Sequence, residues 1–399
     1  MDAVLVAWVE MILRWLHVVA GIAWIGSSFY FIALDLSLRK RDGLPDGVQG
    51  EAWQVHGGGF YNLVKYLVAP ARMPDELTWF KWEAYTTWLS GFALMALVYY
   101  LGAELFLIDP AVERFTPFQA VFCSLAGLLA GWLLYEWACR SDFGRNTTLL
   151  SLAGYVFLVT ATWGFTEIFS GRGAFIQVGA LIGTIMVANV FVVIIPNQKS
   201  TVAALLAGET PDPALGVQAK QRSLHNNYLT LPVVLLMVSN HYPLLFATKY
   251  NWVIVAILLA LGPVIRHFFN ERHAGRASPW WTWGVAALGL AAIGWLSAAG
   301  PRDKLLGAAV VSAPVFAAVE EIVISRCSMC HGDYAAWDGI AAAPKGVKLD
   351  TPERIHAHAA MIGLNAVRSS AMPPGNVTGM EPGERAVLAA WLAAGAPRE

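Results

Sequence analysis

Residues 175–195 read FIQVGALIGTIMVANVFVVII, a run without a charged side chain. About 20 such residues in a helix span the apolar slab of a bilayer, which is roughly 30 Å thick. Seven similar stretches precede residue 300, at 15–36, 82–108, 118–138, 149–169, 229–246, 252–269 and 280–299. The 229–246 stretch is the weakest, because it is short and contains Pro232. We therefore predict an all-α fold that starts as a polytopic membrane bundle of about eight transmembrane helices.

The composition supports this prediction. Of the 399 residues, 57% are hydrophobic and 14% are charged, whereas a soluble domain has about 25% charged residues. A soluble enzyme is therefore excluded. The net charge of −1 excludes a nucleic-acid binder of the usual basic kind. The first apolar segment lacks a basic leader and a small-residue cleavage site, so we expect a retained helix rather than a signal peptide.

Lys and Arg are unevenly distributed over the connecting segments. The loops after the first, third, fifth and seventh stretches contain fourteen of them, and the opposite loops contain only Arg114, Arg172 and Lys249. Cytoplasmic loops carry the excess of basic residues. We therefore expect a protein of the bacterial inner membrane whose N-terminus and C-terminal tail face the periplasm.

The composition changes at a short polar linker, Gly300 to Lys304. Residues 1–300 are thus predicted to form the membrane domain and residues 305–399 a separate small module. The module has ordinary polarity and two stretches with helical apolar spacing, 315–325 and 384–394. It is predicted to be a small all-α domain.

Within this module, residues 327–331 read CSMCH, the C-x-x-C-H pattern of c-type haem attachment. Cys327 and Cys330 would form thioethers with the two porphyrin vinyl groups, and His331 would present its imidazole to the iron. A redox dithiol and half of a zinc site are the alternatives. No second Cys or His pair has zinc-ribbon spacing. We therefore expect covalently bound haem c in a class I-like cytochrome domain on the outer side of the inner membrane, where haem is attached to such motifs.

A low-spin haem needs a sixth ligand, which is a Met in many cytochromes c. Met372 is the best candidate, because Pro373 and Pro374 hold its segment extended. Met361 and Met380 compete with it. Met361 falls in a helical stretch and is expected in the core, and Met380 leads into the last helix.

Ionisable side chains within spanning segments are costly and are functional candidates. His17 lies deep in the first stretch, where it is either a ligand of a b-type haem, with His241 as the second imidazole, or a hydrogen-bonded core residue. The segment 222–232, RSLHNNYLTLP, gathers polar groups at the expected membrane edge. His225, Asn226 and Tyr228 either bind a flat polar ligand or hold helices together. His56 precedes the Gly run 57–59, which permits a positive φ or a close backbone approach.

Taken together, these segments resemble the bacterial membrane-bound urate oxidases that carry a fused C-terminal c-type cytochrome domain. The resemblance covers essentially the whole chain. It rests on residues 16–27 (LHVVAGIAWIGS), 55–60 (VHGGGF), 79–85 (WFKWEAY), 189–191 (NVF), 195–198 (IPNQ), 225–232 (HNNYLTLP) and 327–331 (CSMCH).

The resemblance implies oxidation of urate to 5-hydroxyisourate. The electrons would pass to the haem and on to a respiratory acceptor, such as a terminal oxidase or a soluble cytochrome. We place His225, Asn226, Tyr228 and His56 in the substrate site at the cytoplasmic edge, with a His as general base. Electrons would then have to cross most of the bilayer. Either a b-type haem on His17 and His241 relays them, or the substrate site faces outward.

Two other functions compete with this hypothesis. One is a non-catalytic, membrane-anchored electron-transfer subunit, in which the polar clusters join helices or contact a partner. The other is a quinol:cytochrome c oxidoreductase, in which His and Tyr surround a quinone.

Overall fold

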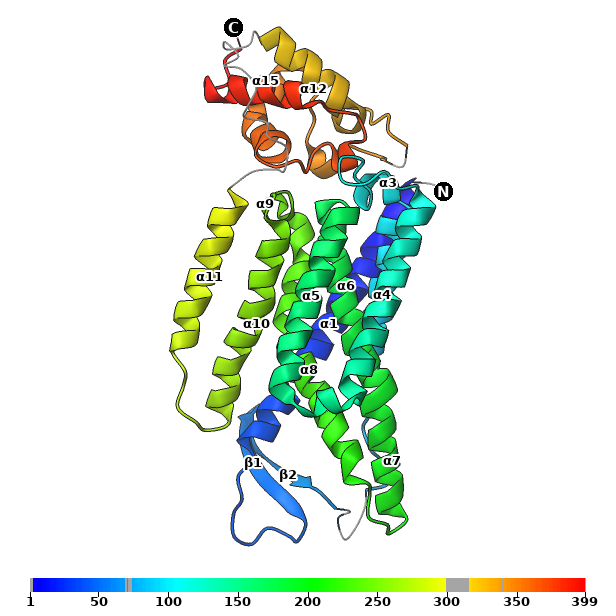
Figure 1. The fold of residues 1–399 in the computed structure, drawn as a ribbon, viewed down its shortest axis with the longest axis vertical. Coiled ribbons are helices and arrows are strands. Elements are labelled where there is room, and N and C mark those ends of the chain that lie inside the picture. Colours follow the sequence, from blue (N-terminus) through cyan, green and yellow to red (C-terminus); the bar gives the residue numbers. More distant parts are fainter. Residues whose placement is uncertain (1–2, 69, 71–73, 299–315, 339, 399) are drawn as a thin grey trace.

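The computed structural model describes residues 3–68, 70, 74–298, 316–338 and 340–398. They form a long helical bundle with a small helical module at one end (Figure 1). We call this the outer end, and the opposite end, which carries a β-hairpin, the inner end. The prediction of an all-α class is confirmed apart from this hairpin. The predicted linker, Gly300 to Lys304, lies outside the described residues.

The bundle is built from the N-terminal three quarters of the chain. Its elements are α1 (Ala3–Ser37), β1 (Val48–His56), β2 (Gly59–Tyr66), α2 (Trp82–Met95), η1 (Ala96–Tyr100), α3 (Ala103–Phe106), α4 (Pro117–Arg140), η2 (Asp142–Arg145), α5 (Thr147–Ile168), α6 (Gly171–Ala188), η3 (Asn189–Ile194), α7 (Ile195–Leu206), α8 (Pro213–Val238), η4 (Ser239–His241), α9 (Pro243–Phe246), α10 (Asn251–His273) and α11 (Trp281–Ser297).

The tail module contains only helical elements among its described residues. These are α12 (Phe316–His331), η5 (Pro344–Gly346), α13 (Pro352–Ala357), α14 (Ala359–Ile362), η6 (Gly363–Val367), η7 (Pro374–Asn376) and α15 (Pro382–Ala393). A hydrophobic core of its own surrounds Ile355, Leu388 and Trp391, which are fully buried. The bundle has a separate core, to which α6 contributes most heavily.

All eight apolar stretches fall on helical segments. Among the described residues, five helices are long and apolar enough to cross a membrane. The predicted number of about eight spans exceeds these five, because three of the predicted stretches do not form a single long apolar helix. Residues 82–108 are divided among α2, η1 and α3, residues 229–246 include the end of α8 with η4 and α9, and α11 is shorter. The five helices are Val4–Ser37, Pro117–Arg140, Thr147–Ile168, Gly171–Leu206 and Asn251–His273.

Local sequence explains where these helices begin. Thr116 and Gln119 form a capping box at the start of α4, and Pro117 occupies its first turn. Ser170 caps α6 by accepting a hydrogen bond from the Gly173 amide. The same Ser170 hydroxyl donates to the carbonyl oxygen of Phe106 at 2.7 Å. This bond joins the start of α6 to the end of α3 at the outer end.

Helix α8 begins much earlier than the sequence predicts. The apolar pattern places its start near Leu229, but Asp212 caps a helix that runs from Pro213 through Pro232. Gly262 on α10 makes room for the proline ring, since a Cβ atom there would lie 2.3 Å from Pro232 Cδ. Residues 222–232 therefore form part of a helix inside the bundle.

The side surface of the bundle, which runs between the outer and inner ends, is apolar. Trp295 and Leu288 on α11 are 76% and 75% exposed, and Trp15 and Ile22 on α1 are 68% and 67% exposed. Exposed apolar surface on this scale is typical of a surface that contacts lipid or another protein.

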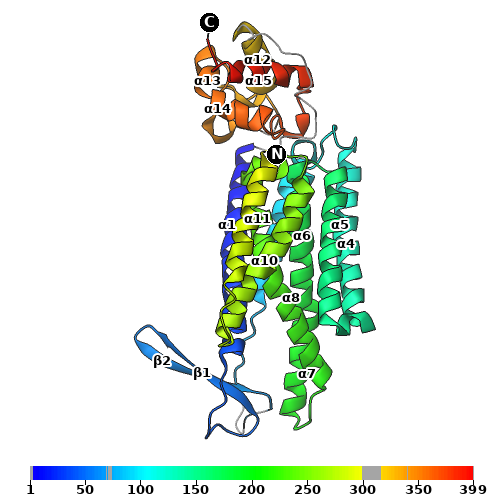
Figure 2. The same ribbon diagram turned by 60° about the vertical axis from the view of Figure 1, so that its left-hand side comes forward.

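The β-hairpin was not predicted. Strands β1 and β2 pair antiparallel, with His56 opposite Gly59, and Gly57 and Gly58 form the turn with φ of 59° and 80°. Two consecutive positive φ values define the type I′ turn that suits such hairpins. The Gly run does supply the positive φ values expected of it. The hairpin projects away from the bundle at the inner end (Figure 2).

Candidate functional site

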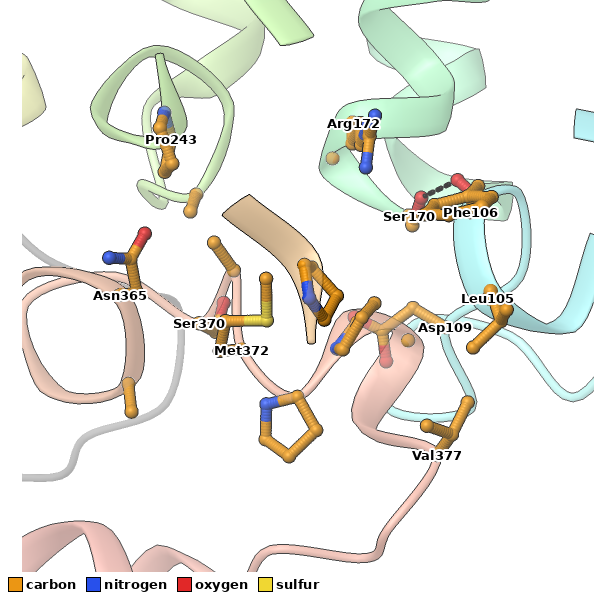
Figure 3. Close-up of a pocket in the computed structure, with 18 of the residues that line it drawn as sticks. Leu105, Phe106, Asp109, Ser170, Arg172, Pro243, Asn365, Ser370, Met372 and Val377 are labelled. Atoms are coloured by element: carbon orange, nitrogen blue, oxygen red, sulfur yellow. Dashed lines mark hydrogen bonds between the residues drawn. The ribbon is translucent and has the colours of Figure 1, made fainter. Parts of the chain in front are cut away.

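A cavity of about 530 Å³ lies between the tail module and the outer end of the bundle. We call it the tail cavity. Cys327, Cys330, His331 and Met372 all line it, as do Arg172, Asn240 and His241 from the bundle. Figure 3 shows Met372 on the tail side and Arg172, Ser170 and Phe106 on the bundle side. Its volume is within the range of about 300–1,000 Å³ that is usual for cofactor sites.

The C-x-x-C-H motif forms the last turn of α12, which ends at His331. Cys327, Cys330 and His331 thus have the i, i+3, i+4 spacing that places side chains on one helix face. The Nδ1 atom of His331 lies 2.8 Å from the carbonyl oxygen of Val347. A metal-binding His commonly donates its second ring N–H to such a carbonyl, which leaves Nε2 for the metal. These residues fit a c-type haem.

The alternatives for the two cysteines fit less well. Burial raises the pKa of the Cys327 thiol to about 12 and also raises that of Cys330, whereas reactive dithiols have a lowered pKa. Within the described ranges, no group of three or more His, Cys, Asp or Glu side chains gathers as a metal site. A zinc site would need such a group.

Backbone contacts hold Met372 at the cavity. Its amide donates to the carbonyl oxygen of Asn365 at 2.9 Å, and its own carbonyl accepts from Arg385 at 2.9 Å. Of its competitors, Met380 is 2% exposed in the core of the tail module. Met361 is 42% exposed and lines the cavity, so its predicted core position is wrong. The helix that carries it turns this side chain toward the cavity rather than toward the core.

A second group of polar residues lies toward the inner end, where α4, η3 and α8 meet. We call Tyr135, Asn189, Arg222, His225 and Asn226 the inner cluster. The Tyr135 hydroxyl lies 2.7 Å from His225 Nδ1 and accepts from Asn189 at 3.0 Å. Asn189 also donates to the Asn226 side chain at 2.9 Å. Asn189 opens the π-helical segment η3, and such segments are frequent at functional sites.

Arg222 gives the inner cluster a buried cation. It forms an ion pair with Glu136 at 2.8 Å and lies 5.0 Å from the centre of the Tyr135 ring. Its Nε and Nη1 atoms are buried without a hydrogen-bond partner. The cluster can hold helices together, and it also offers donors to an anion.

The structure does not gather all four residues that were predicted for the substrate site. His225 and Asn226 belong to the inner cluster. Tyr228 instead lies near Arg266, which contacts Asn227 on the α10 side of α8. His56 is exposed at the tip of the hairpin, away from the cluster.

The two imidazoles predicted for a b-type haem have separate surroundings. His17 Nδ1 lies 2.9 Å from the carbonyl oxygen of Thr87, and its ring packs against Gly91 of α2. A Cβ atom on Gly91 would lie 2.7 Å from His17 Cε1. His241 belongs to η4 at the outer end and lines the tail cavity. The contacts of His17 are those of a hydrogen-bonded core residue.

Comparison with known proteins identifies a family that matches the bundle. Residues 3–297 match the protein family described as urate oxidase N-terminal. The match covers the bundle, including the inner cluster and the bundle side of the tail cavity.

The chain belongs to the urate oxidase N-terminal family. The match ends before the tail module, so the C-x-x-C-H motif lies outside the matched region. No curated protein matches the chain, and no solved structure does.

On the bundle side of the tail cavity, the sequence analysis named His241 but did not predict Arg172 and Asn240 as site residues. Arg172 was named only as one of three basic residues in the loops with few Lys and Arg, and Asn240 was not named. They are far apart in sequence and lie at different helix ends, so no local pattern joins them. A basic residue in the first turn of α6 was the one available signal, because cations are unfavourable at a helix N-terminus.

Proposed function

We propose that the protein is a membrane-bound oxidoreductase that oxidises urate and passes the electrons to a haem c held by its own tail. One observation carries this proposal: the bundle, which belongs to the urate oxidase N-terminal family, and the C-x-x-C-H motif line one cavity. An oxidase domain and an electron acceptor joined in this way need no diffusing partner for the first electron transfer.

The residues of the tail would hold the haem in distinct ways. Cys327 and Cys330 would attach it covalently, and His331 and Met372 would bind its iron. A c-type haem supplies one-electron acceptance, with a potential that Met ligation raises. Arg385 and Asn365 fix the backbone of Met372, so they would set where its thioether lies.

The reaction requires an external acceptor. Uric acid and one water molecule give 5-hydroxyisourate, two electrons and two protons. A single haem accepts one electron at a time. Each urate therefore requires two electron transfers to the haem, and the haem must pass each electron on to an external acceptor. We therefore propose a respiratory acceptor, a terminal oxidase or a soluble cytochrome, on the side of the tail module.

The distribution of charge supports an orientation in the bacterial inner membrane. The loops with the excess of Lys and Arg belong to the inner end, and the tail module and the start of α1 lie at the outer end (Figure 1). By the positive-inside rule, the outer end would face the periplasm. The apolar side surface of the bundle would contact lipid.

The test is anaerobic addition of urate to isolated membranes, with the absorption of the c-type haem as the readout. We expect prompt reduction of the haem by urate. Reduction by a quinol but not by urate would favour a quinol:cytochrome c oxidoreductase. Reduction by neither would favour an electron-transfer anchor subunit.

A further inference from the structure

At the outer end of the bundle, Arg172 and Asn240 line the tail cavity, and Tyr99 is buried next to Arg172. Tyr99 Oη, Arg172 Nε and Asn240 Oδ1 are all buried without a partner. Tyr99 is only 4% exposed. Buried polar groups in proteins are nearly always hydrogen-bonded, so a group of unpaired ones points to a missing ligand.

Arg172 lies beside two aromatic rings. The guanidinium of Arg172 lies 5.9 Å from the ring centre of Tyr99 and 4.6 Å from that of Phe106. Arg172 and Asn240 both line the tail cavity. The two aromatic rings restrict the guanidinium by cation–π contact, which leaves its donors available to a ligand in the cavity.

The charge of this region favours an anion. Arg172 lies in the first turn of α6, which contains no acidic residue, so a cation adjoins the positive end of a helix dipole. Lys345 of the tail also lines the cavity. Asp109 lines it too, but it accepts a hydrogen bond from the Ala111 amide at 3.0 Å. A bound anion would compensate Arg172 and the helix terminus together.

We propose that Arg172 and Asn240 bind the urate anion at the outer end, in the cavity that also holds the haem motif. This inference rests on the proposed function and adds the place of the substrate to it. Arg172 would donate to a carbonyl oxygen of the purine, and Asn240 Oδ1 would accept from a ring N–H.

The location removes the need for a relay through the bilayer. His225 of the inner cluster lies thirteen residues before the end of α8 at Val238, which is about 20 Å of helix. Electrons from the inner cluster would have to cross this distance. A purine beside Arg172 would share a cavity with Cys327, Cys330 and His331.

A propionate of the haem has the same anionic chemistry and is the other source of a ligand for Arg172. The test therefore measures urate binding and a property of the haem in the same variants. Labelled urate is dialysed anaerobically against the purified holoprotein after reduction with dithionite, so that no turnover occurs. The variants are Arg172→Gln, Arg172→Lys, His225→Ala and Arg114→Gln. The last removes the same charge from an exposed position of the outer end.

We expect Arg172→Gln to weaken urate binding at least tenfold and Arg172→Lys to restore part of the loss. Arg114→Gln should bind as the wild type does, and the reduction potential of the haem should remain near the wild-type value in all four. Unchanged binding with a shifted potential in Arg172→Gln would assign Arg172 to a propionate and overturn the proposal. Loss of binding in His225→Ala alone would move the site to the inner cluster. A wild type that neither binds urate nor is reduced by it would instead reject the proposed function.

Discussion

The imidazole of His331 lies 2.8 Å from the carbonyl oxygen of Val347, sixteen residues later in the chain. This contact orients the ring at the end of α12 and leaves Nε2 for a metal. Arg385 and Asn365 fix the backbone of Met372, so the tail module carries both residues that we propose as ligands of the haem iron.

The first prediction concerns Met372. Met372→Ala should keep the haem covalently attached, lose the absorption of Met-ligated low-spin haem and lower the reduction potential, because Met ligation raises it. Spectra of the oxidised protein and a redox titration measure this. Met361→Leu is the control, since Met361 lines the same cavity. Loss of the low-spin spectrum in Met361→Leu, with Met372→Ala unchanged, would contradict the assignment.

Covalent attachment should depend on the motif cysteines alone. The double change of Cys327 and Cys330 to Ala should abolish haem staining of the denatured polypeptide, because no thioether can form. The same double change at Cys123 and Cys139, which lie on α4 of the bundle, should leave staining intact. Staining that survives the first change would reject the c-type haem.

Close packing between α8 and α10 gives a prediction about stability. Gly262→Ala would place a methyl group 2.3 Å from Pro232 Cδ, and overpacking of this kind costs about 1–3 kcal/mol. We expect a lower thermal midpoint in detergent. Gly164→Ala on α5 is the matched control, because nothing lies within 4 Å of its added Cβ. Equal midpoints for the two variants would show that α8 and α10 do not pack as described.

The tail module should lose stability in acid through Asp350. Its carboxyl accepts from Arg354 at 2.6 Å and from the Asp333 amide at 2.7 Å, and the hydrogen bond from Arg354 is the main cause that lowers its pKa. The ionised form is thus favoured in the folded state. Its contribution is present above the unfolded pKa of about 3.9 and is lost as pH falls through the lower folded value.

Asp350→Asn should therefore lower the denaturation midpoint at about pH 7, and the difference from wild type should shrink toward about pH 3. Soret circular dichroism of the full-length holoprotein follows the tail module. Asp338→Asn, at an exposed position of the same module, should resemble wild type throughout. A difference for Asp350→Asn that stays constant with pH would contradict the role of its charge.

The sequence predicted the elements better than their contacts. Each of the eight apolar runs falls on a helical part of the bundle, because apolar residues over about 20 positions are a local property. These runs missed the start of α8, because its first turns from Pro213 are mostly exposed, so no apolar run marks them. The hairpin was missed because its one clear signal, the Gly57–Gly58 turn, was treated as a loop.

The residues of the candidate site also divide into those that a local pattern predicted and those that only contacts between distant residues reveal. Cys327, Cys330 and His331 form a contiguous motif and were named from sequence, and Met372 followed from its proline context. Tyr135 was not named, because its contact with His225 joins residues 90 positions apart. Arg172 and Tyr99 were missed for the same reason. The spacing of charged residues located the loops, but it did not show which side chains contact each other across helices.

The most direct test of the central claim is an anaerobic titration of the purified, oxidised holoprotein with urate. If the electrons of urate enter the tail haem, each urate should reduce two haems, with 5-hydroxyisourate formed in step. Formation of product while the haem stays oxidised, or a haem that urate does not reduce at any ratio, would contradict the account.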